Sequence, residues 1–405
     1  MLVGKLEHQL PEARRSYPNA STIDNWPFIF KEFERQLGYT TLMSEDFPIM
    51  SVFNYRLKGF GLQPTTKYLR TWWKAANKMF EDTNPISEKC NHEFAYSYLK
   101  SFMREYADEK KFAFVVSNLA HNYPQRSVLS DQDVYDLYQE MNRTGQLDHS
   151  LVLLFGDHGD RASDFRRTMQ GKLEERLPFM SLTLPKWFPK TFKGKFNNLK
   201  ANSKVLTTHY DIYATLGHVL NKLDRKPDHI YGRSLFTDLT SLNRTCEKAG
   251  IDSHWCPCLS YTTLKTTDPV VKTVALKIVK YINGLIAKDS KPRMSCARLK
   301  LGRITRAAEQ AVNQDVVEFA ETKRNSACDE CGIVKRKGFK FHKRIFEIVF
   351  IVTPSKGEFE VTAEYNLMTG KITTGSISRI NLYGTQPECI AREYPYLRKY
   401  CFCKQ

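Results

Sequence analysis

The residues best placed to do chemistry lie in the run 155–160, where Gly156-Asp157-His158-Gly159 sets a carboxylate beside an imidazole. The apolar run 151–154 comes directly before them and predicts a strand that ends at this point. Aspartate and histidine at a strand end are side chains that can hold a divalent metal ion. The alternative is an ordinary polar turn, because glycine and aspartate are common turn residues.

Three other polar positions accompany this motif. His121 follows the apolar run 112–116, Lys172 lies in the charged segment 170–176, and His209 precedes the apolar-periodic stretch 210–220. If the run 112–116 is a parallel strand next to 151–155, then His121 and Asp157 occupy adjacent strand-end loops. Open α/β sheets form their sites in such a crevice, so we expect Asp157 and His158 at the carboxyl end of a central parallel strand, with His121 beside them.

The elements that would position these residues alternate between helix and strand. Apolar residues at helical spacing predict helices near 30–37, 94–103, 134–141 and 212–220, the first of them ended by Gly38. Short apolar runs predict strands at 39–43, 112–116, 151–155 and 177–184. This alternation is typical of a mostly parallel α/β sheet flanked by helices.

The rest of the chain has a different pattern. Residues 225–270 lose the periodicity and read as a cysteine-containing linker, after which a helix is expected at 274–285. Alternating apolar residues at 346–350 and 359–365 flank the turn residues 353–357 and predict a hairpin, and Ile380 with Leu382 predicts one more strand. We therefore expect an α/β core at 1–224, a linker at 225–270 and a small α+β module at 271–405.

The order of the motifs resembles the sulfatase branch of the alkaline phosphatase superfamily. There, a strand leads to a histidine-containing loop before a proline, and then come a metal-binding Asp-His or Asp-Asn, a basic segment and a helix start. The corresponding blocks here are 117–124, 156–159, 170–180 and 207–216. Segments 26–33, 54–60, 173–179 and 250–258 are most similar to a poorly characterised secreted or membrane-tethered animal family of unknown function. The resemblance extends over residues 20–265.

The resemblance implies a metal-dependent hydrolase of sulfate or phosphate esters. Asp157 and His158 would be ligands of a divalent metal, calcium or zinc, which neutralises the ester oxygens and activates a nucleophile. His121 would lie near the leaving group, and Lys172 would contact a substrate oxygen. For Lys172 the alternatives are Arg176 in that role or an ordinary solvated lysine, and His209 is expected to have a structural role at its helix start.

The chain departs from the sulfatase pattern in three places. Residues 1–21 contain no strand that ends in a metal-binding aspartate and no nucleophile loop, and no Gly-Lys-Trp-His block follows Gly38-Tyr39. Ser117 stands where two-metal enzymes have an aspartate. We therefore expect an amino-terminally truncated core, from an incomplete gene model or a pseudoenzyme, that is inactive and holds its metal weakly if at all. The alternative function is a secreted non-catalytic protein that binds acidic glycans on the hydrolase scaffold.

Composition supports a globular protein with a basic surface. The 405 residues are 41% hydrophobic and 12% aromatic, and they carry a net charge of +17. Basic runs at 186–204 and 335–343 suit an anionic partner, whereas the alternative is a solvated surface without a partner. No nucleic-acid-binding motif accompanies the charge, and no apolar segment reaches membrane-spanning length.

Cysteine usage indicates an oxidising compartment. Nine of the ten cysteines follow residue 240, and this clustering predicts a disulfide-linked carboxy-terminal module with Cys90 as the unpaired one. Zinc is the alternative, with Cys328-Asp329-Glu330-Cys331 and Cys401-Phe402-Cys403 as half-sites. Sequons at Asn19, Asn142 and Asn243 agree with secretion. We expect an extracellular protein whose signal segment precedes Met1.

Overall fold

A computed structural model describes residues 1–49, 51–79, 88–121, 124–161, 163–223, 230–258, 261–310 and 343–404. The chain forms two compact units. The first contains residues 1–160 and 177–250, and the second contains residues 161–176 and 251–405. The segment 161–176 therefore leaves the first unit, packs in the second and returns, whereas the sequence analysis assigned it to the core at 1–224.

A three-stranded parallel sheet lies in the first unit, in the order β2-β1-β3. Its strands are β1 (Thr40–Glu45), β2 (Lys67–Tyr68) and β3 (Lys111–Val116). The register pairs Thr40 with Lys111 and Glu45 with Val116, so β1 and β3 end at the same edge. The parallel sheet predicted from the helix–strand alternation is confirmed.

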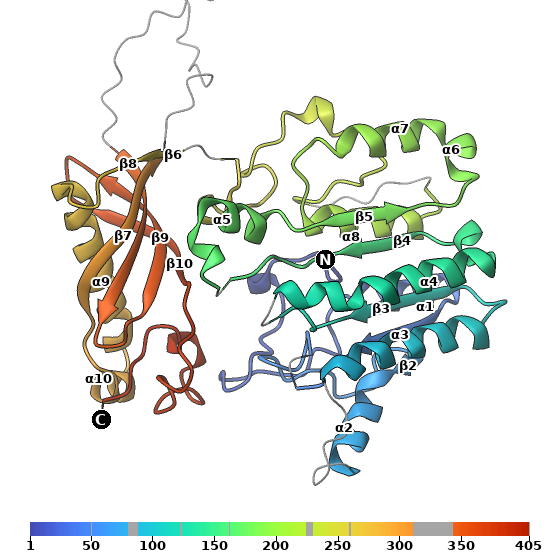
Figure 1. The fold of residues 1–405 in the computed structure, drawn as a ribbon, viewed down its shortest axis with the longest axis horizontal. Coiled ribbons are helices and arrows are strands. Elements are labelled where there is room, and N and C mark those ends of the chain that lie inside the picture. Colours follow the sequence, from blue (N-terminus) through green and yellow to red (C-terminus); the bar gives the residue numbers. More distant parts are fainter. Residues whose placement is uncertain are drawn as a thin grey trace, which may run out of the picture. The chain divides into compact units, whose positions relative to one another are not determined.

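Helices cover this sheet on both faces (Figure 1), namely α1 (Ile29–Leu37), α2 (Leu69–Met79), α3 (Glu88–Glu105), α4 (Asp131–Arg143) and α8 (His209–Leu220). Successive side chains of a strand point to opposite faces. Accordingly Leu42 packs in the cluster of α3 and α4, whereas its neighbour Met43 packs in the cluster of α1 and α8. Gly38 ends α1 in the left-handed conformation at φ 66°, as its position in the sequence predicted.

The strand before the Asp-His motif pairs differently from the expectation. It is β4 (Val152–Phe155), which is antiparallel to β5 (Met180–Thr183), in a separate two-stranded sheet of the described residues. The prediction of a central parallel strand at this position is wrong. The apolar run 151–154 could not reveal this, because periodicity does not report strand direction. After β5 come α6 (Phe188–Thr191) and α7 (Lys193–Asn202).

A five-stranded antiparallel sheet, in the order β10-β9-β8-β7-β6, forms the second unit with α9 (Pro269–Ala287) and α10 (Ser290–Ser295). Its strands are β6 (Tyr261–Thr263), β7 (Lys300–Gln310), β8 (Lys343–Thr353), β9 (Glu358–Asn366) and β10 (Ile372–Arg379). The predicted β8–β9 hairpin is confirmed. The additional strand suggested by Ile380 and Leu382 is present as β10, but it lies earlier in the chain and ends at Arg379. Short 3₁₀ helices occur at Glu7–Gln9, Pro124–Ser130, Gln146–His149, Phe165–Arg167, Thr240–Leu242, Ser253–Trp255 and Pro395–Leu397.

The two faces of this sheet differ in chemistry. Phe346, Ile348 and Phe350 of β8 pack against Val274 and Ile278 of α9 in an apolar core. The intervening positions of β8 and β9 place Glu347, Glu360 and Thr362 on the opposite face, where they are buried as well. That polar face is where α5 (Met169–Arg176) lies.

Disulfides link the carboxy-terminal residues. Cys296 bonds to Cys401 and Cys389 to Cys403, and both Cys246 and Cys256 are disulfide-bonded. The predicted disulfide-linked module is thus confirmed, although Cys258 is free and exposed. Cys328, Cys331 and the side chain of Cys90 lie outside the described residues. Among the helices described, none combines the length and the apolar character that crossing a membrane requires.

Candidate functional site

The loop after β4 carries the predicted metal ligands of the first unit. Its start is fixed because the Gly156 N–H donates to the Phe179 carbonyl at 2.9 Å and so continues the pairing of β4 with β5. The side chain of Asp157 is 80% exposed and that of His158 is 34% exposed. The loop therefore presents both side chains to solvent at adjacent positions.

The ring of His158 is oriented by one carbonyl and lies close to one carboxylate. Nδ1 lies 2.7 Å from the Gly159 carbonyl oxygen, and because a carbonyl only accepts, Nδ1 carries a proton. Nε2 lies 3.5 Å from a carboxylate oxygen of Asp157. In a neutral ring the Nε2 lone pair would face this anionic oxygen, which is unfavourable. A metal ion between the two atoms would remove the repulsion.

A divalent metal fits this pair in part. Zinc bonds to nitrogen and oxygen at about 2.1 Å, which puts two tetrahedral ligands about 3.4 Å apart; Nε2 and the carboxylate oxygen are 3.5 Å apart. Zinc needs at least three protein ligands for firm binding, and calcium takes more oxygens still. Across the described ranges, no third His, Cys, Asp or Glu atom joins the pair within 4.8 Å. The loop thus supplies two ligands of an incomplete set.

His209 ties this loop to α8. Its Nε2 lies 3.4 Å from the Gly156 carbonyl oxygen, one residue before Asp157. Burial lowers the pKa of His209, and the hydrogen bond to Gly156 opposes this. The start of α8 is independently capped, since Thr208 accepts from the Tyr210 N–H and Asp211 accepts from the Thr208 N–H. His209 therefore has a structural role, as expected.

His121 lies in a second loop, which follows β3 and is organised around Asp46. The Asp46 carboxylate accepts the Ser117 hydroxyl at 2.8 Å, the Asn118 N–H at 2.8 Å and the Asn118 side-chain amide at 3.0 Å. His121 is exposed, and its N–H donates to the Asn118 carbonyl at 2.9 Å. Convergence of His121 on Asp157 stays a prediction. Asp46 was not predicted from the sequence, because the strand expected at 39–43 continues to Glu45 and so places Asp46 directly at its end.

Glu45, the last residue of β1, is an unusual buried carboxyl group beside Asp46. It is 1% exposed, one of its oxygens accepts the Val52 N–H at 2.8 Å, and the other has no hydrogen-bond partner. Burial raises the pKa of Glu45 to about 7, against the hydrogen bond from Val52. Near neutral pH this carboxyl is therefore about half protonated.

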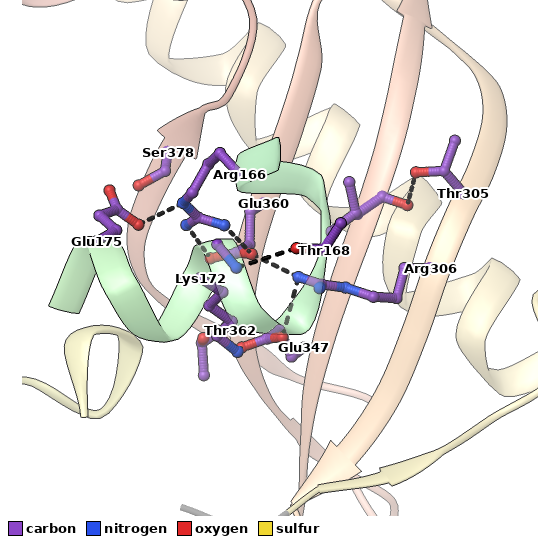
Figure 2. Close-up of polar contacts among 12 residues, drawn as sticks. Arg166, Thr168, Lys172, Glu175, Thr305, Arg306, Glu347, Glu360, Thr362 and Ser378 are labelled. Atoms are coloured by element: carbon purple, nitrogen blue, oxygen red, sulfur yellow. Dashed lines mark hydrogen bonds and ion pairs between the residues drawn. The ribbon is translucent and has the colours of Figure 1, made fainter. Parts of the chain in front are cut away.

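Lys172, the proposed substrate-contacting lysine, belongs to the second unit, whereas Asp157 and His158 belong to the first. Its ammonium forms an ion pair with Glu347 of β8 and lies 4.7 Å from the centre of the Tyr261 ring. The side chain is 3% exposed, and burial lowers the pKa of Lys172. Figure 2 shows Lys172 pointing from α5 toward the sheet. Its ammonium is therefore already neutralised by a carboxylate.

Lys172 belongs to a buried charge network centred on Glu360 of β9 (Figure 2). Arg166 donates to both oxygens of Glu360 at 2.9 and 3.1 Å, and Arg176 and Arg306 donate to it at 2.8 and 2.7 Å. Arg166 also pairs with Glu175. Burial alone would raise the pKa of Glu360, but the guanidinium groups lower it to about 2. This network fastens segment 161–176 to the polar face of the second sheet.

His254 is a neutral residue on the same polar face of the second sheet. Its Nδ1 is 3.0 Å from the Thr362 hydroxyl and its Nε2 is 3.0 Å from the Ser378 hydroxyl. Burial lowers the pKa of His254 to about 4. Because Arg176 and Lys172 also disfavour a charged ring, His254 stays uncharged at neutral pH.

These features define a mixed α/β protein with an exposed Asp-His loop in one unit and an antiparallel, disulfide-linked sheet in the other. A family model described as a protein of unknown function, DUF229, matches residues 1–305. The chain belongs to this family. No curated protein and no solved structure shows significant similarity to the chain.

Proposed function

We propose that this chain is a sulfatase- or phosphatase-like protein, derived from metal-dependent ester hydrolases, in which Asp157 and His158 bind a divalent metal ion. The observation that carries the proposal is the 3.5 Å separation of His158 Nε2 and the Asp157 carboxylate, with Nδ1 committed to the Gly159 carbonyl. A bound cation would neutralise the oxygens of a sulfate or phosphate ester. Asp157 and His158 would hold it, and the Gly159 carbonyl orients the ring so that Nε2 lies toward the Asp157 carboxylate.

We expect no turnover by these 405 residues. The ammonium of Lys172 is paired with Glu347 and the hydroxyl of Ser117 is donated to Asp46, so neither is free to contact an ester. Two protein ligands also hold a metal weakly. The second candidate function is therefore a non-catalytic protein that binds acidic glycans on the same scaffold. Its disulfides fit an oxidising compartment, and we propose secretion.

Calorimetric titration with zinc and with calcium tests the metal site. The chain offers a matched control, because Asp148-His149 is an exposed Asp-His dipeptide in the same unit. We expect weak binding by the unaltered chain, at least tenfold weaker binding by Asp157→Ala/His158→Ala, and unchanged binding by Asp148→Ala/His149→Ala. Equal affinities in all three proteins would refute the assignment.

Hydrolysis assays with aryl sulfates and aryl phosphates test the expected lack of activity. We expect no hydrolysis above the rate without protein, with or without added metal. Turnover that the unaltered chain shows and Asp157→Ala abolishes would mean that a nucleophile of this chain works with the metal. That result would contradict the expected lack of activity, but it would not contradict the proposed metal site.

A further inference from the structure

One segment of the first unit concentrates positive charge. Segment 186–204, which includes α6 and α7, contains six lysines and no aspartate or glutamate. We call it the α6–α7 surface, and its lysines are Lys186, Lys190, Lys193, Lys195, Lys200 and Lys204. Five of them are exposed and Lys195 is half-buried. None forms an ion pair with another described residue, in contrast to the basic side chains of the Glu360 network.

The lysines follow the geometry of α7. At 3.6 residues per turn, Lys193 and Lys200 are nearly two turns apart and lie on one stripe, about 10 Å from each other along the axis. Lys204 follows one turn later, after the helix ends at Asn202. A row of charges with this spacing suits a ligand that carries its negative charges at intervals rather than a single small anion.

The helix is held rigidly, so the row is a fixed platform. Asn202, buried at the end of α7, donates to the Leu235 and Thr237 carbonyls at 2.9 and 2.7 Å and accepts the Leu239 N–H at 3.0 Å. Asn198, one turn earlier, donates to the Phe236 carbonyl at 3.1 Å. Binding to such a surface orders few additional residues, which preserves affinity.

An open depression adjoins the row. Its volume is about 650 Å³, and the buried side chains of Phe236 and His218 line it together with Phe192, Lys193 and Lys195. Asp238 is the acidic residue of its lining, and its carboxylate accepts the Thr240 hydroxyl at 2.6 Å and the Thr240 N–H at 2.9 Å. The depression thus combines the half-buried ring of Phe192 with the ammonium groups of Lys193 and Lys195 and one carboxylate.

We propose that the α6–α7 surface binds an acidic polysaccharide, one whose sulfate or carboxylate groups pair with the lysine row while a sugar ring enters the depression. Aromatic side chains suit the apolar face of a sugar ring, and mobile lysine ammonium groups suit anions spaced along a chain. The disulfides favour a polysaccharide over a nucleic acid, because they form in compartments where nucleic acids are not the usual polyanion. A membrane is less suited, because the exposed positions of α7 are Lys193, Gly194, Asn197, Lys200 and Ala201, which form no large apolar face.

This inference specifies the ligand of the second candidate function and does not depend on the Asp157–His158 pair. The test compares binding to heparin, as a sulfated polysaccharide probe, at several salt concentrations. The test variant is Lys193→Gln/Lys200→Gln/Lys204→Gln. The control is Lys272→Gln/Lys280→Gln/Lys288→Gln, which removes the same charge from exposed positions on and beside α9.

We expect the test variant to bind heparin at least tenfold more weakly, with a shallower dependence of log affinity on log salt concentration. The control should remain within twofold of the unaltered chain, and circular dichroism should show both variants folded. If heparin affinity fell equally in the two variants, the net charge of the protein would explain the binding, and the proposal would be overturned. Tighter lysine-dependent binding to duplex DNA or to phosphatidylserine vesicles than to heparin at the same salt would overturn the choice of partner. Unchanged heparin binding by Asp157→Ala/His158→Ala would show that this surface acts separately from the metal site.

Discussion

The β4 loop and the Glu360 network hold charged side chains in opposite ways. In the loop, Asp157 is 80% exposed and faces a histidine nitrogen across 3.5 Å. In the network, Arg166, Lys172 and Arg176 and the three carboxylates that they pair with are each at most 4% exposed. A buried charge whose partners are in place has little left to offer a ligand, whereas an exposed pair can still recruit a cation from solvent. Charged residues close together in the sequence, such as those from 157 to 176, can therefore have different roles.

The largest effect should come from breaking the network at its centre. Replacement of Glu360 by alanine removes the carboxylate that Arg166, Arg176 and Arg306 share and leaves the buried Arg176 without its ion-pair partner. We expect a loss of about 3–5 kcal/mol in the free energy of unfolding. Urea denaturation measures it. Glu388→Ala, at an exposed position of the same unit, should change stability by less than about 0.5 kcal/mol. A similarly small change in Glu360→Ala would mean that the network does not hold segment 161–176.

The pH dependence of the first unit should come from Glu45. Its folded pKa of about 7 lies above the unfolded value of 4.5. The folded state therefore binds more protons between these values, and stability falls as pH rises through them, by about 3 kcal/mol from this group. The free energy of unfolding is measured by denaturation at pH 4 and at pH 8. Between these values it should fall less in Glu45→Gln than in the unaltered chain, by this amount. An identical decline in both proteins would show that Glu45 titrates normally.

His254 should produce the opposite trend in the second unit. Its folded pKa of about 4 lies below the ordinary 6.5. The unfolded state binds more protons in that window, so this group's stabilisation is complete above 6.5 and is lost as pH falls toward 4, by about 3 kcal/mol. His254→Gln should lose less stability than the unaltered chain between pH 7 and pH 4. A larger acid sensitivity in the variant would contradict the assignment of a neutral ring.

The smallest effect on stability is expected at the candidate metal site itself. Asp157→Ala/His158→Ala removes exposed side chains, so without metal the free energy of unfolding should change by less than about 0.5 kcal/mol. The measurement is the same urea titration after chelator treatment. If the free energy of unfolding fell by more than about 2 kcal/mol, Asp157 and His158 would be stabilising the fold. They would then not differ in role from the Glu360 network.

The sequence predicted local elements better than their arrangement. Gly38 and the spacing of Phe30 and Phe33 indicated α1, and the alternation around 353–357 indicated the β8–β9 hairpin, because turn chemistry and periodicity are local properties. The direction of β4 and the transfer of segment 161–176 to the second unit depend on contacts distant in sequence. The ion pair of Lys172 could not be predicted for the same reason, since its partner Glu347 is 175 residues away in the sequence.

Of the candidate site, only the two ligands Asp157 and His158 could be predicted from the sequence. Asp157 and His158 stand next to each other in the sequence, so any loop brings them together. Asp46 was missed because its partners Ser117 and Asn118 come from another strand end, more than 70 residues later. The burial of Glu45 was missed for a similar reason, since a glutamate at a strand end is ordinarily solvated.

The most direct test of the account is nitrogen NMR of the histidine rings during titration with zinc. We predict that His158 keeps its proton on Nδ1 while its Nε2 resonance shifts with added metal, and that the shift is absent in Asp157→Ala. His254, held by two hydroxyl groups in the buried face, should not respond. A His158 ring that is unaffected by zinc, or one that coordinates through Nδ1, would contradict the metal site proposed here.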